Sequence, residues 1–592
     1  MSNCPTPPLP GMGAIVTDTG TGFRVWAPNA QAVSVVVGES EYPAVAEQSG
    51  TWYAFVDGAR PGEHYRFRLT AADGSTLERI DPYAAQVTNS VGVGVIYDHA
   101  AFDWEGDKFT CPPLNELVIY ELHTGTFAPK AGENVGDFAD VEDKLSYLDT
   151  LGINAIQLMP VAEFAGDYSW GYNPAHIFAV ESAYGGPDAL KELVKAAHRH
   201  GIAVIQDVVY NHFGPSDLDL WRFDGWSAND KGGIYFYNDD RSATPWGDTR
   251  PDFGRPEVRA YIHDNALSWL RDFHMDGLRF DMVPYIYSVD GSDWGIPDGW
   301  RLLRWINSDI HASFPGAVTI AEDLHSRRSV TDDGTAGARF SSQWDAQFVH
   351  PVREALVGVS DSDRSTTAVV QAVSFSYGDA FSRVIYTESH DEVANGKARV
   401  PQEIDPADPD GYFARKRSTL GAALVFTSPG VPMLFQGQEF LEGGWFRDTV
   451  PVDWDAAEEF HAILRLYRDL IRLRLNLDGQ TAGLAGGGLW VYHINDSAKV
   501  FAFQRWRDHG ARDDVVVVVN LSDQTFDSYR IGMPTTGTWQ LLLNTDASVY
   551  SDDFGNTYSV AVEAVDSVYD GMTSSAEISI GPYTMLLYSW QG

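Results

Sequence analysis

Residues 202–212 read Ile-Ala-Val-Ile-Gln-Asp-Val-Val-Tyr-Asn-His, an apolar run that ends in polar side chains. A short run rich in β-branched residues is typical of a strand buried on both faces, as in a parallel sheet. Before it, apolar residues recur at helical spacing from Leu190 to Ala197, between Pro187, which suits a first helical turn, and Gly201, which suits a helix stop. The sequence therefore predicts a helix followed by a buried strand.

The same alternation of helix and strand recurs along the middle of the chain. One helix is expected to carry apolar residues from Val141 to Leu151 on a single face, and another to run from Pro256 to Phe273. Eight alternations, without a GxGxxG dinucleotide loop, favour a (β/α)8 TIM barrel over an open doubly wound sheet. The other seven strands are expected at residues 117–120, 153–159, 278–283, 317–321, 343–348, 382–387 and 431–435.

Segments rich in strand-forming residues flank this region on both sides. Residues 23–26 and 65–69 alternate between apolar and polar side chains, which predicts short antiparallel strands. The helical pattern ends near residue 480, and Val-, Tyr- and Thr-rich segments follow. We therefore expect three domains: an N-terminal β-sandwich at residues 1–110, a catalytic barrel at 111–478 with a short excursion at about 210–256, and a C-terminal β-sandwich at 479–592.

The amino-acid composition argues against several classes of binding partner. The 592 residues include 42 Lys+Arg and 82 Asp+Glu, and the net charge of -40 repels nucleic acid and anionic membranes. The two cysteines, Cys4 and Cys111, exclude a disulfide framework and the usual thiolate zinc sites. The sequence shows neither a secretory signal at its start nor an apolar run long enough to span a membrane. We expect a cytoplasmic monomer or small oligomer.

Four of the predicted strands end in carboxylate, imidazole or guanidinium side chains. In a parallel barrel, the carboxyl ends of all strands open onto one face, where the reactive groups of such enzymes lie. A single acidic residue at a strand end is commonplace, whereas four such clusters point to one pocket. The clusters lie at residues 207–212, 276–281, 320–323 and 388–392.

Cleavage of a glycosidic bond uses this set of groups. One carboxylate stabilises the positive, oxocarbenium-like transition state, and a second carboxyl group protonates the departing oxygen. Asp281 and Glu322 end neighbouring strands, which favours the close spacing of a retaining mechanism. Arg279 lies two residues before Asp281 and so faces the same side of the strand, where its charge can keep that carboxylate ionised. For Glu322, a raised pKa is expected.

The four clusters resemble the four short motifs of the α-amylase superfamily of retaining glycosidases and transglycosidases, in the same order and with similar spacing. The resemblance extends from about Val25 to Trp454. It implies that Asp281 is the nucleophile, Glu322 the general acid and base, and Asp391 a third carboxylate that binds sugar hydroxyls. The substrate would be an α-glucan or maltooligosaccharide, contacted by Tyr172 as a stacking platform and by Asp207, His212, Arg279 and His390.

Several activities of this superfamily remain open. Residues 23–30 resemble the β-sandwich that precedes the barrel in branching enzymes, debranching enzymes and maltooligosyltrehalose trehalohydrolases. Residues 320–323, 386–392 and 434–440 resemble glucan branching enzymes, which transfer a cleaved α-1,4 chain to a 6-hydroxyl. Branching is therefore the first expectation. The alternatives are hydrolysis of maltooligosyltrehalose or of an α-1,4-glucan, another α-glucosyl transfer, and, more remotely, noncatalytic glucan binding.

A metal is considered but not expected. Asn211 matches a position that binds calcium in many α-amylases, and the segment from 210 to 256 is rich in Asp. That segment lacks the spaced ligands of an EF-hand-type calcium loop. The prediction is therefore no cofactor, with a structural calcium possible but not favoured.

Overall fold

The computed structural model describes residues 9–132 and 135–592, so Cys4 lies outside the described residues. The chain divides into two compact units. One comprises Met1–Thr110, His123–Asp143 and Leu158–Glu322, and the other comprises Cys111–Leu122, Lys144–Gln157 and Asp323–Gly592.

Eight strands form a closed barrel and follow one another around it in chain order. A strand is present at each of the expected places, so the (β/α)8 prediction is confirmed. The strand expected at 343–348 ends at Trp344, because the Asp345 side chain caps helix α8 (Ala346–Val357), which contains residues 346–348. The pairing is parallel, for example between β14 and β15 and between β18 and β19. The strands are β10 (Ile119–Leu122), β11 (Ala155–Leu158), β14 (Ala203–Val208), β15 (Gly277–Phe280), β16 (Val318–Ala321), β17 (Ser342–Trp344), β18 (Arg383–Ile385) and β19 (Val431–Phe435).

The helices agree with the predictions except at one place. Helix α4 (Gly186–Arg199) has its proline in the first turn, and α5 (Pro256–Asp272) begins at the expected proline. The single helix expected from Val141 to Leu151 is two helices, α2 (Phe138–Glu142) and α3 (Leu145–Leu151). Asp137 caps α2 through a capping box, and a new helix, α3, begins after Lys144. The apolar spacing continues across this break, which is why the sequence predicts a single helix.

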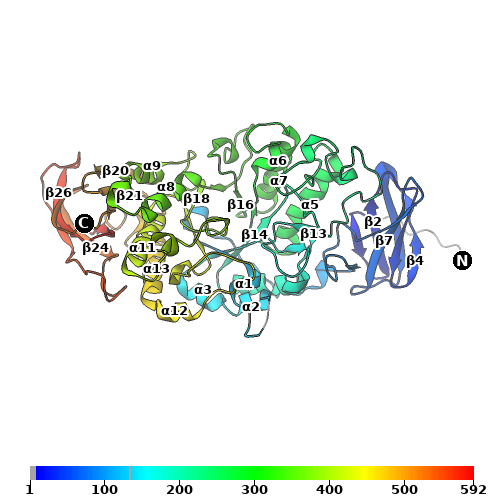
Figure 1. Cartoon of the computed structure of the whole chain (residues 1–592), viewed down its shortest axis with the longest axis horizontal. Helices are drawn as coiled ribbons and strands as arrows, with labels where there is room; N and C mark the ends of the chain where they lie inside the picture. Colours follow the sequence, from blue (N-terminus) through cyan, green and yellow to red (C-terminus); the bar gives the residue numbers. More distant parts are fainter. Residues whose placement is uncertain (1–8, 133–134) are drawn as a thin grey trace. The chain divides into compact units, whose positions relative to one another are not determined.

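In the first unit, the N-terminal segment forms two antiparallel sheets, seen in blue in Figure 1. Apolar side chains from both sheets, such as Phe23 and Phe67, are fully buried, as expected for a β-sandwich. One sheet contains β1 (Gly13–Val16), β2 (Gly20–Trp26), β6 (Thr51–Asp57) and β5 (Val45–Ala46); the other contains β4 (Ser40–Pro43), β3 (Ala32–Val37), β7 (His64–Thr70) and β8 (Thr76–Arg79), with β9 (Gly94–Val95) beside β7.

The sandwich is bonded to the excursion that follows β14. Asp224, fully buried, accepts hydrogen bonds from the backbone N–H and the side-chain amide of Asn29, each 2.9 Å long. Arg79 donates to the carbonyl oxygen of Phe223 at 3.0 Å, and the backbone N–H of Ile80 donates to an excursion carboxylate at 2.6 Å. These bonds anchor a segment that otherwise contains only short 3-10 turns.

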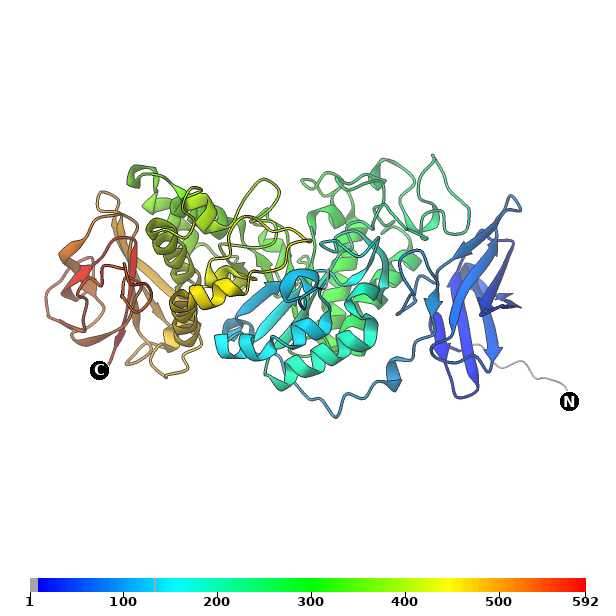
Figure 2. The same cartoon turned by 60° about the horizontal axis from the view of Figure 1, so that its bottom comes forward.

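In the second unit, the C-terminal segment is all-β. A six-stranded sheet packs with the two-stranded sheet of β23 (Phe526–Met533) and β26 (Ser574–Ile580), which lie at the red end of the chain in Figure 2. Trp539 is fully buried among the aliphatic side chains between the sheets. The larger sheet contains β20 (Gly488–Asn495), β21 (Val500–Trp506), β22 (Val515–Asn520), β27 (Thr584–Trp590), β24 (Gly537–Asn544) and β25 (Val562–Ala564).

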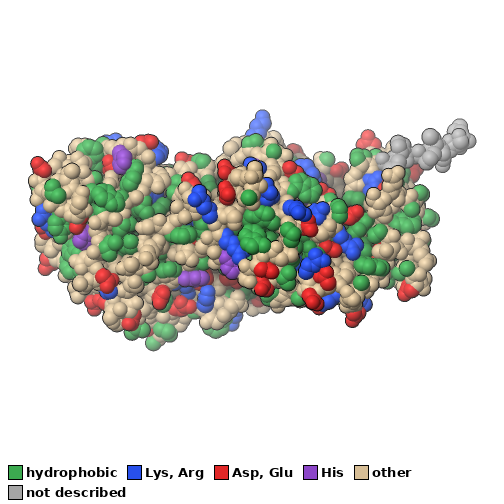
Figure 3. All heavy atoms as spheres, turned by 90° about the horizontal axis from the view of Figure 1, so that it is seen from above, with side chains coloured by type: hydrophobic (Ala, Val, Ile, Leu, Met, Phe, Trp, Pro, Cys, Tyr) green, Lys and Arg blue, Asp and Glu red, His purple; other side chains and the backbone are tan. Residues whose placement is uncertain are grey.

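The distribution of surface charge and the apolar character of the helices bear on the expected binding partners. On the face shown in Figure 3, acidic and basic side chains are interspersed rather than gathered into patches of one sign. Within residues 9–132 and 135–592, no helix combines the length and apolar character that crossing a membrane requires.

A buried ion pair joins the C-terminal sheet to the barrel helix α11 (Tyr412–Thr427) in the second unit. Lys416 Nζ lies 2.6 Å from Asp546 Oδ1, and both side chains are inaccessible to solvent. Asp546 also accepts the backbone N–H groups of Gly555 and Thr557. Burial lowers the pKa of Lys416, while the carboxylate favours its charged form.

Loss of this lysine should weaken the second unit. We expect Lys416→Met to lower the free energy of unfolding by about 3–5 kcal/mol, because Asp546 would remain buried without its counterion. Urea unfolding followed by tryptophan fluorescence measures the change. The control is Lys499→Met, which removes an ion pair to the exposed Asp496 and should cost less than about 1 kcal/mol. Equal effects of the two substitutions would contradict the argument.

Candidate active site

One arginine holds three carboxylates in the first unit. Arg279 Nη1 lies 2.7 Å from Asp207 Oδ2 and 3.2 Å from Asp281 Oδ1, and its Nη2 lies 2.6 Å from Glu322 Oε2. Arg279 is fully buried, and each carboxylate is at most 5% exposed. These four predicted site residues therefore form one cluster, and its carboxylates outnumber its cation.

Strand register explains why these side chains meet. Asp207 on β14 lies opposite Arg279 on β15, and Phe280 lies opposite Ala321 on β16. The next residues, Asp281 and Glu322, continue this register, since the Glu322 N–H donates to the Phe280 carbonyl at 3.0 Å. Polar side chains thus follow directly after fully buried strands.

Two neighbours fix the orientation of Asp281. The side-chain amide of Asn211 donates to Asp281 Oδ2 at 2.6 Å and to its backbone carbonyl at 2.9 Å. His212 Nδ1 lies 2.5 Å from Asn211 Oδ1, and the His212 ring stacks on Trp246 with centroids 4.6 Å apart. Burial lowers the pKa of His212 to about 4, so this imidazole is neutral at physiological pH.

Tyr172 reaches the same cluster from the loop between β12 (Ala162–Phe164) and β13 (Pro174–Val180). Its hydroxyl donates to Asp207 Oδ2 at 2.6 Å, and its ring centroid lies 5.8 Å from the Arg279 guanidinium carbon. Gly171 permits this approach, because it has φ +93° and a Cβ at this position would lie 2.2 Å from the Pro160 carbonyl oxygen. The hydroxyl of Tyr172 therefore orients a carboxylate, a contact that its expected stacking role did not include.

The protonation of Asp281 differs from the sequence-based expectation. Arg279 lowers the pKa of Asp281, as expected. Burial and the neighbouring Glu322 carboxylate have the larger effect, and together they raise the pKa of Asp281 well above its usual value. Three buried carboxylates around one guanidinium would carry an excess of negative charge if all were ionised, and a proton on Asp281 relieves it.

His390 and Asp391 lie next to each other in the second unit, after β18. Glu121 binds His390 twice: its Oε1 lies 2.8 Å from Nδ1, and its Oε2 accepts the His390 backbone N–H at 3.0 Å. The other ring nitrogen of His390 lies 3.5 Å from Asp391 Oδ2. Asp391 is the most exposed of the predicted site carboxylates, with a side chain 41% accessible to solvent.

Sequence reasoning missed the contact of Glu121 with His390 and that of Asn211 with Asp281. Glu121 is a fully buried charge inside the apolar strand β10, and a buried carboxylate requires a partner, which is the signal that could have identified it. Asn211 was considered only as a calcium ligand, whereas its amide binds Asp281. Among the described residues, no group of three or more His, Cys, Asp or Glu side chains could hold a metal ion.

The raised pKa of Asp281 predicts a pH-dependent cost in stability. A folded-state pKa above the unfolded value of about 3.9 means that stability is fully present at low pH and is lost as pH rises toward the folded pKa. We therefore expect Asp281→Asn to raise the thermal unfolding midpoint at pH 7 by roughly 2–4 °C, equivalent to about 1 kcal/mol, and by less at pH 4. Calorimetry at both pH values measures this.

The matched control is Asp552→Asn, which changes an exposed carboxylate. It should leave the midpoint unchanged at both pH values. If Asp281→Asn stabilised the protein no more at pH 7 than at pH 4, the electrostatic account of the cluster would be wrong.

Comparisons with known proteins agree with this architecture. The catalytic domain of alpha amylase matches residues 121–223 and 218–508, and the all-beta C-terminal domain of alpha amylase matches 490–591. Carbohydrate-binding module 48, the isoamylase N-terminal domain, matches residues 11–84.

Similar structures share the fold. The crystal structure of a pullulanase from Anoxybacillus sp. LM18-11 has a TM-score of 0.78 and 22% sequence identity, covering 98% of this chain and 86% of that chain. The pullulanase type I from Bacillus subtilis, solved in complex with maltose, also has a TM-score of 0.78, at 20% identity, with the same coverage of 98% and 86%.

Curated relatives are similar over almost the whole length. The 1,4-alpha-glucan branching enzyme GlgB of Corynebacterium jeikeium is 32% identical over 608 residues, which cover 97% of this chain and 82% of that protein. The GlgB of Corynebacterium glutamicum is 31% identical over 615 residues, covering 98% and 81%. Given these matches and the catalytic-domain match across more than half of its length, the chain belongs to the alpha-amylase family.

Proposed function

We propose that this protein is a retaining 1,4-α-glucan branching enzyme. The observation that carries the proposal is the buried Arg279 guanidinium, which binds the carboxylates of both Asp281 and Glu322. Two carboxyl groups held side by side suit retaining cleavage of a glycosidic bond. Branching rather than hydrolysis is supported by the full-length similarity to proteins named 1,4-alpha-glucan branching enzyme.

In the first half-reaction, Asp281 attacks the anomeric carbon of an α-1,4-linked glucose. The bond from that carbon to the glycosidic oxygen breaks, and Glu322 gives its proton to the oxygen, so the departing chain leaves with a 4-hydroxyl. Arg279 and the Met282 N–H both donate to Glu322 Oε2, at 2.6 and 2.9 Å. We infer that the proton is carried on Oε1.

In the second half-reaction, a 6-hydroxyl of another glucan chain takes the place of water. Glu322, now ionised, accepts the proton of this hydroxyl while its oxygen attacks the anomeric carbon. The ester bond to Asp281 breaks, which restores both carboxyl groups and leaves an α-1,6 branch. The two residues supply nucleophile, acid and base, so the proposed steps use no cofactor.

The other predicted residues are proposed to bind the sugar that reacts. Tyr172 stacks on the ring, since an aromatic face suits the weakly apolar C–H face of a sugar. Asp207, His212, His390 and Asp391 take its hydroxyl groups, and the negative side chains among them favour the positive transition state. Arg279 offsets part of the negative charge of the cluster.

Incubation with amylose tests the proposal. We expect proton NMR to show new α-1,6 signals with few new reducing ends, and Asp281→Ala to lower the rate by several orders of magnitude with an unchanged circular dichroism spectrum. The control Asp552→Asn should branch normally. New reducing ends without branches would favour hydrolysis, and release of trehalose from maltooligosyltrehalose would favour the trehalohydrolase alternative.

Glu121 is proposed to position His390. Glu121→Gln removes the charge and one of the two acceptors, so we expect branching kcat/KM to fall roughly 10- to 100-fold, as for a charged hydrogen bond worth about 1.5–3 kcal/mol. Thermal unfolding checks that the variant is folded. The matched control is Glu354→Gln, an exposed position on α8 (Ala346–Val357), which should retain its activity. Normal kcat/KM in Glu121→Gln would contradict the assignment.

A further inference from the structure

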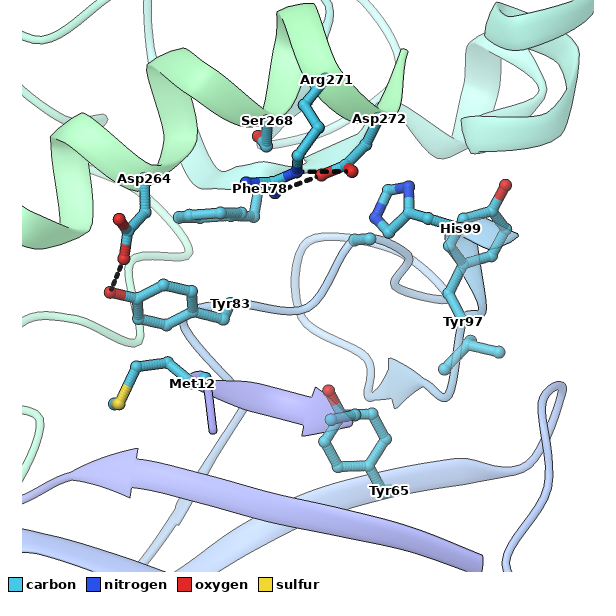
Figure 4. Close-up of a pocket in the computed structure, with 14 residues that line it drawn as sticks. Met12, Tyr65, Tyr83, Tyr97, His99, Phe178, Asp264, Ser268, Arg271 and Asp272 are labelled. Carbon is cyan, nitrogen blue, oxygen red and sulfur yellow. Dashed lines mark hydrogen bonds and ion pairs between the residues drawn. The ribbon is translucent and has the colours of Figure 1, made fainter. Parts of the chain in front are cut away.

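A cavity in the first unit and a loop in the second unit both lie outside the carboxylate cluster. The cavity, of about 350 Å³, lies between the N-terminal sandwich and helix α5 (Figure 4). Polar side chains in its wall bond to one another, as the Tyr83 hydroxyl does to Asp264 at 3.3 Å. The loop, residues 386–399 between β18 and α10 (Val400–Ile404), bears directly on the proposed reaction, because it carries Asp391. We call it the Asp391 loop.

One guanidinium closes the Asp391 loop. Arg353, on helix α8, donates from Nη1 to the carbonyl oxygen of Thr387 at 2.7 Å, close to the start of the loop. Its Nη2 donates to the carbonyl oxygen of Ala398 at 3.0 Å, one residue before the end of the loop. The Arg353 side chain is buried. A single buried side chain therefore binds both ends of the loop.

A carboxylate holds this guanidinium in place. Arg353 Nη2 lies 2.8 Å from Glu403 Oε2 on α10, and Glu403 Oε1 accepts the backbone N–H of Ala398 at 2.9 Å. The planar guanidinium carries five N–H donors in a fixed fork, so it can bind acceptors from several segments at once. Helix α8, helix α10 and the two ends of the Asp391 loop thus meet at one side chain.

Further ion pairs brace the Asp391 loop from within. Glu392 lies 2.9 Å from Lys397 Nζ and 3.1 Å from His350 Nε2. Burial opposes ionisation of Glu392, but the hydrogen bonds from His350 and Lys397 lower its pKa to about 2, so it is charged at physiological pH. Glu388 Oε2 lies 3.0 Å from Arg399 Nη1, and both side chains are buried. The loop backbone is therefore tied at several points.

Asp391 itself is held more loosely than the loop that carries it. Its Oδ1 lies 3.4 Å from the Asn395 amide nitrogen, and its Oδ2 lies 3.5 Å from a ring nitrogen of His390. Both distances exceed those of strong charge-assisted hydrogen bonds, about 2.7–2.9 Å. The side chain is also 41% exposed. The place of this carboxylate is therefore set by the loop backbone more than by its own side-chain contacts.

We propose that Arg353 is a positioning residue for Asp391, because it closes the loop that brings this carboxylate to the reacting sugar. The assignment rests on the proposed function, in which Asp391 binds sugar hydroxyls. Arg353 acts through the loop backbone and does not take part in the chemical steps. A loop tied at both ends loses less entropy on binding a ligand than an open loop, and a misplacement of about 1 Å can lower a rate about 100-fold.

A double-mutant cycle tests this positioning role. Arg353→Met removes the donors that bind both ends of the loop, so we expect kcat for branching of amylose to fall at least about 10-fold. In the Asp391→Asn background the same substitution should have almost no further effect, since the carboxylate that Arg353 positions is already absent. Equal factors in the two backgrounds would overturn the proposal, because they would indicate a general structural role.

The matched control is Arg417→Met. Arg417 is also buried, and its Nη1 donates to two carbonyl oxygens, of Leu356 at 3.0 Å and of Gly358 at 2.7 Å, near the end of α8 and not in the Asp391 loop. It should leave kcat unchanged. If Arg353→Met does not fold, Arg353→Lys takes its place in the cycle, because it keeps the buried charge but lacks the planar fork of donors.

Hydrogen exchange followed by mass spectrometry reads the loop independently of activity. Peptides that cover residues 386–399 should exchange faster in Arg353→Met than in the wild-type protein or in Arg417→Met. If the wild-type protein forms branches but this exchange is unchanged in Arg353→Met, the positioning role is wrong and the proposed function stands. If the wild-type protein releases reducing ends without branches, the branching assignment fails, and the same cycle on the rate of that release decides the role of Arg353. Absence of any activity on glucans would overturn both.

Discussion

A single buried guanidinium is the interaction on which the candidate active site depends. Without Arg279, the carboxylates of Asp207, Asp281 and Glu322 would be buried like charges with no counterion, an arrangement that a protein interior does not tolerate. The same solution recurs in the second unit, where Arg399 binds Glu388 and Arg383 binds Asp345. An acidic chain thus uses some of its few cations as buried counterions.

One cation cannot neutralise three carboxylates, and the resulting imbalance of negative charge affects the protonation of the cluster. Burial, together with this imbalance, raises the pKa of Asp281, so the cluster can hold a proton at a pH where an isolated carboxyl group would be ionised. A general acid needs such a proton, and its nucleophilic partner must lose it when the sugar arrives. The electrostatic strain that lowers stability is therefore the same strain that suits the proposed reaction, a common conflict in active sites.

Sequence reasoning identified the barrel and the guanidinium cluster for one physical reason. Strands buried on both faces must be apolar, so Asp207 stands out near the end of such a run, and Asp281 and Glu322 stand out directly after one. The helix break after Glu142 was missed because apolar spacing continues across it, and only the backbone geometry at Lys144 reveals the break. Glu121 and Asn211 act through contacts between segments far apart in the sequence, which periodicity does not report.

The N-terminal sandwich has a structural part in the site, because it holds the excursion that follows β14. His212 and its stacking partner Trp246 lie at the two ends of an excursion that lacks long helices and strands of its own. Hydrogen bonds from Asn29, Arg79 and Ile80 hold that excursion, and Trp26 packs edge to face against Tyr235 within it. A loop fixed at several points loses less entropy when it binds a ligand than a free loop would. The sandwich and the excursion belong to one compact unit, so the sandwich contributes to the orientation of the His212 side of the site without its described residues contacting the carboxylate cluster itself.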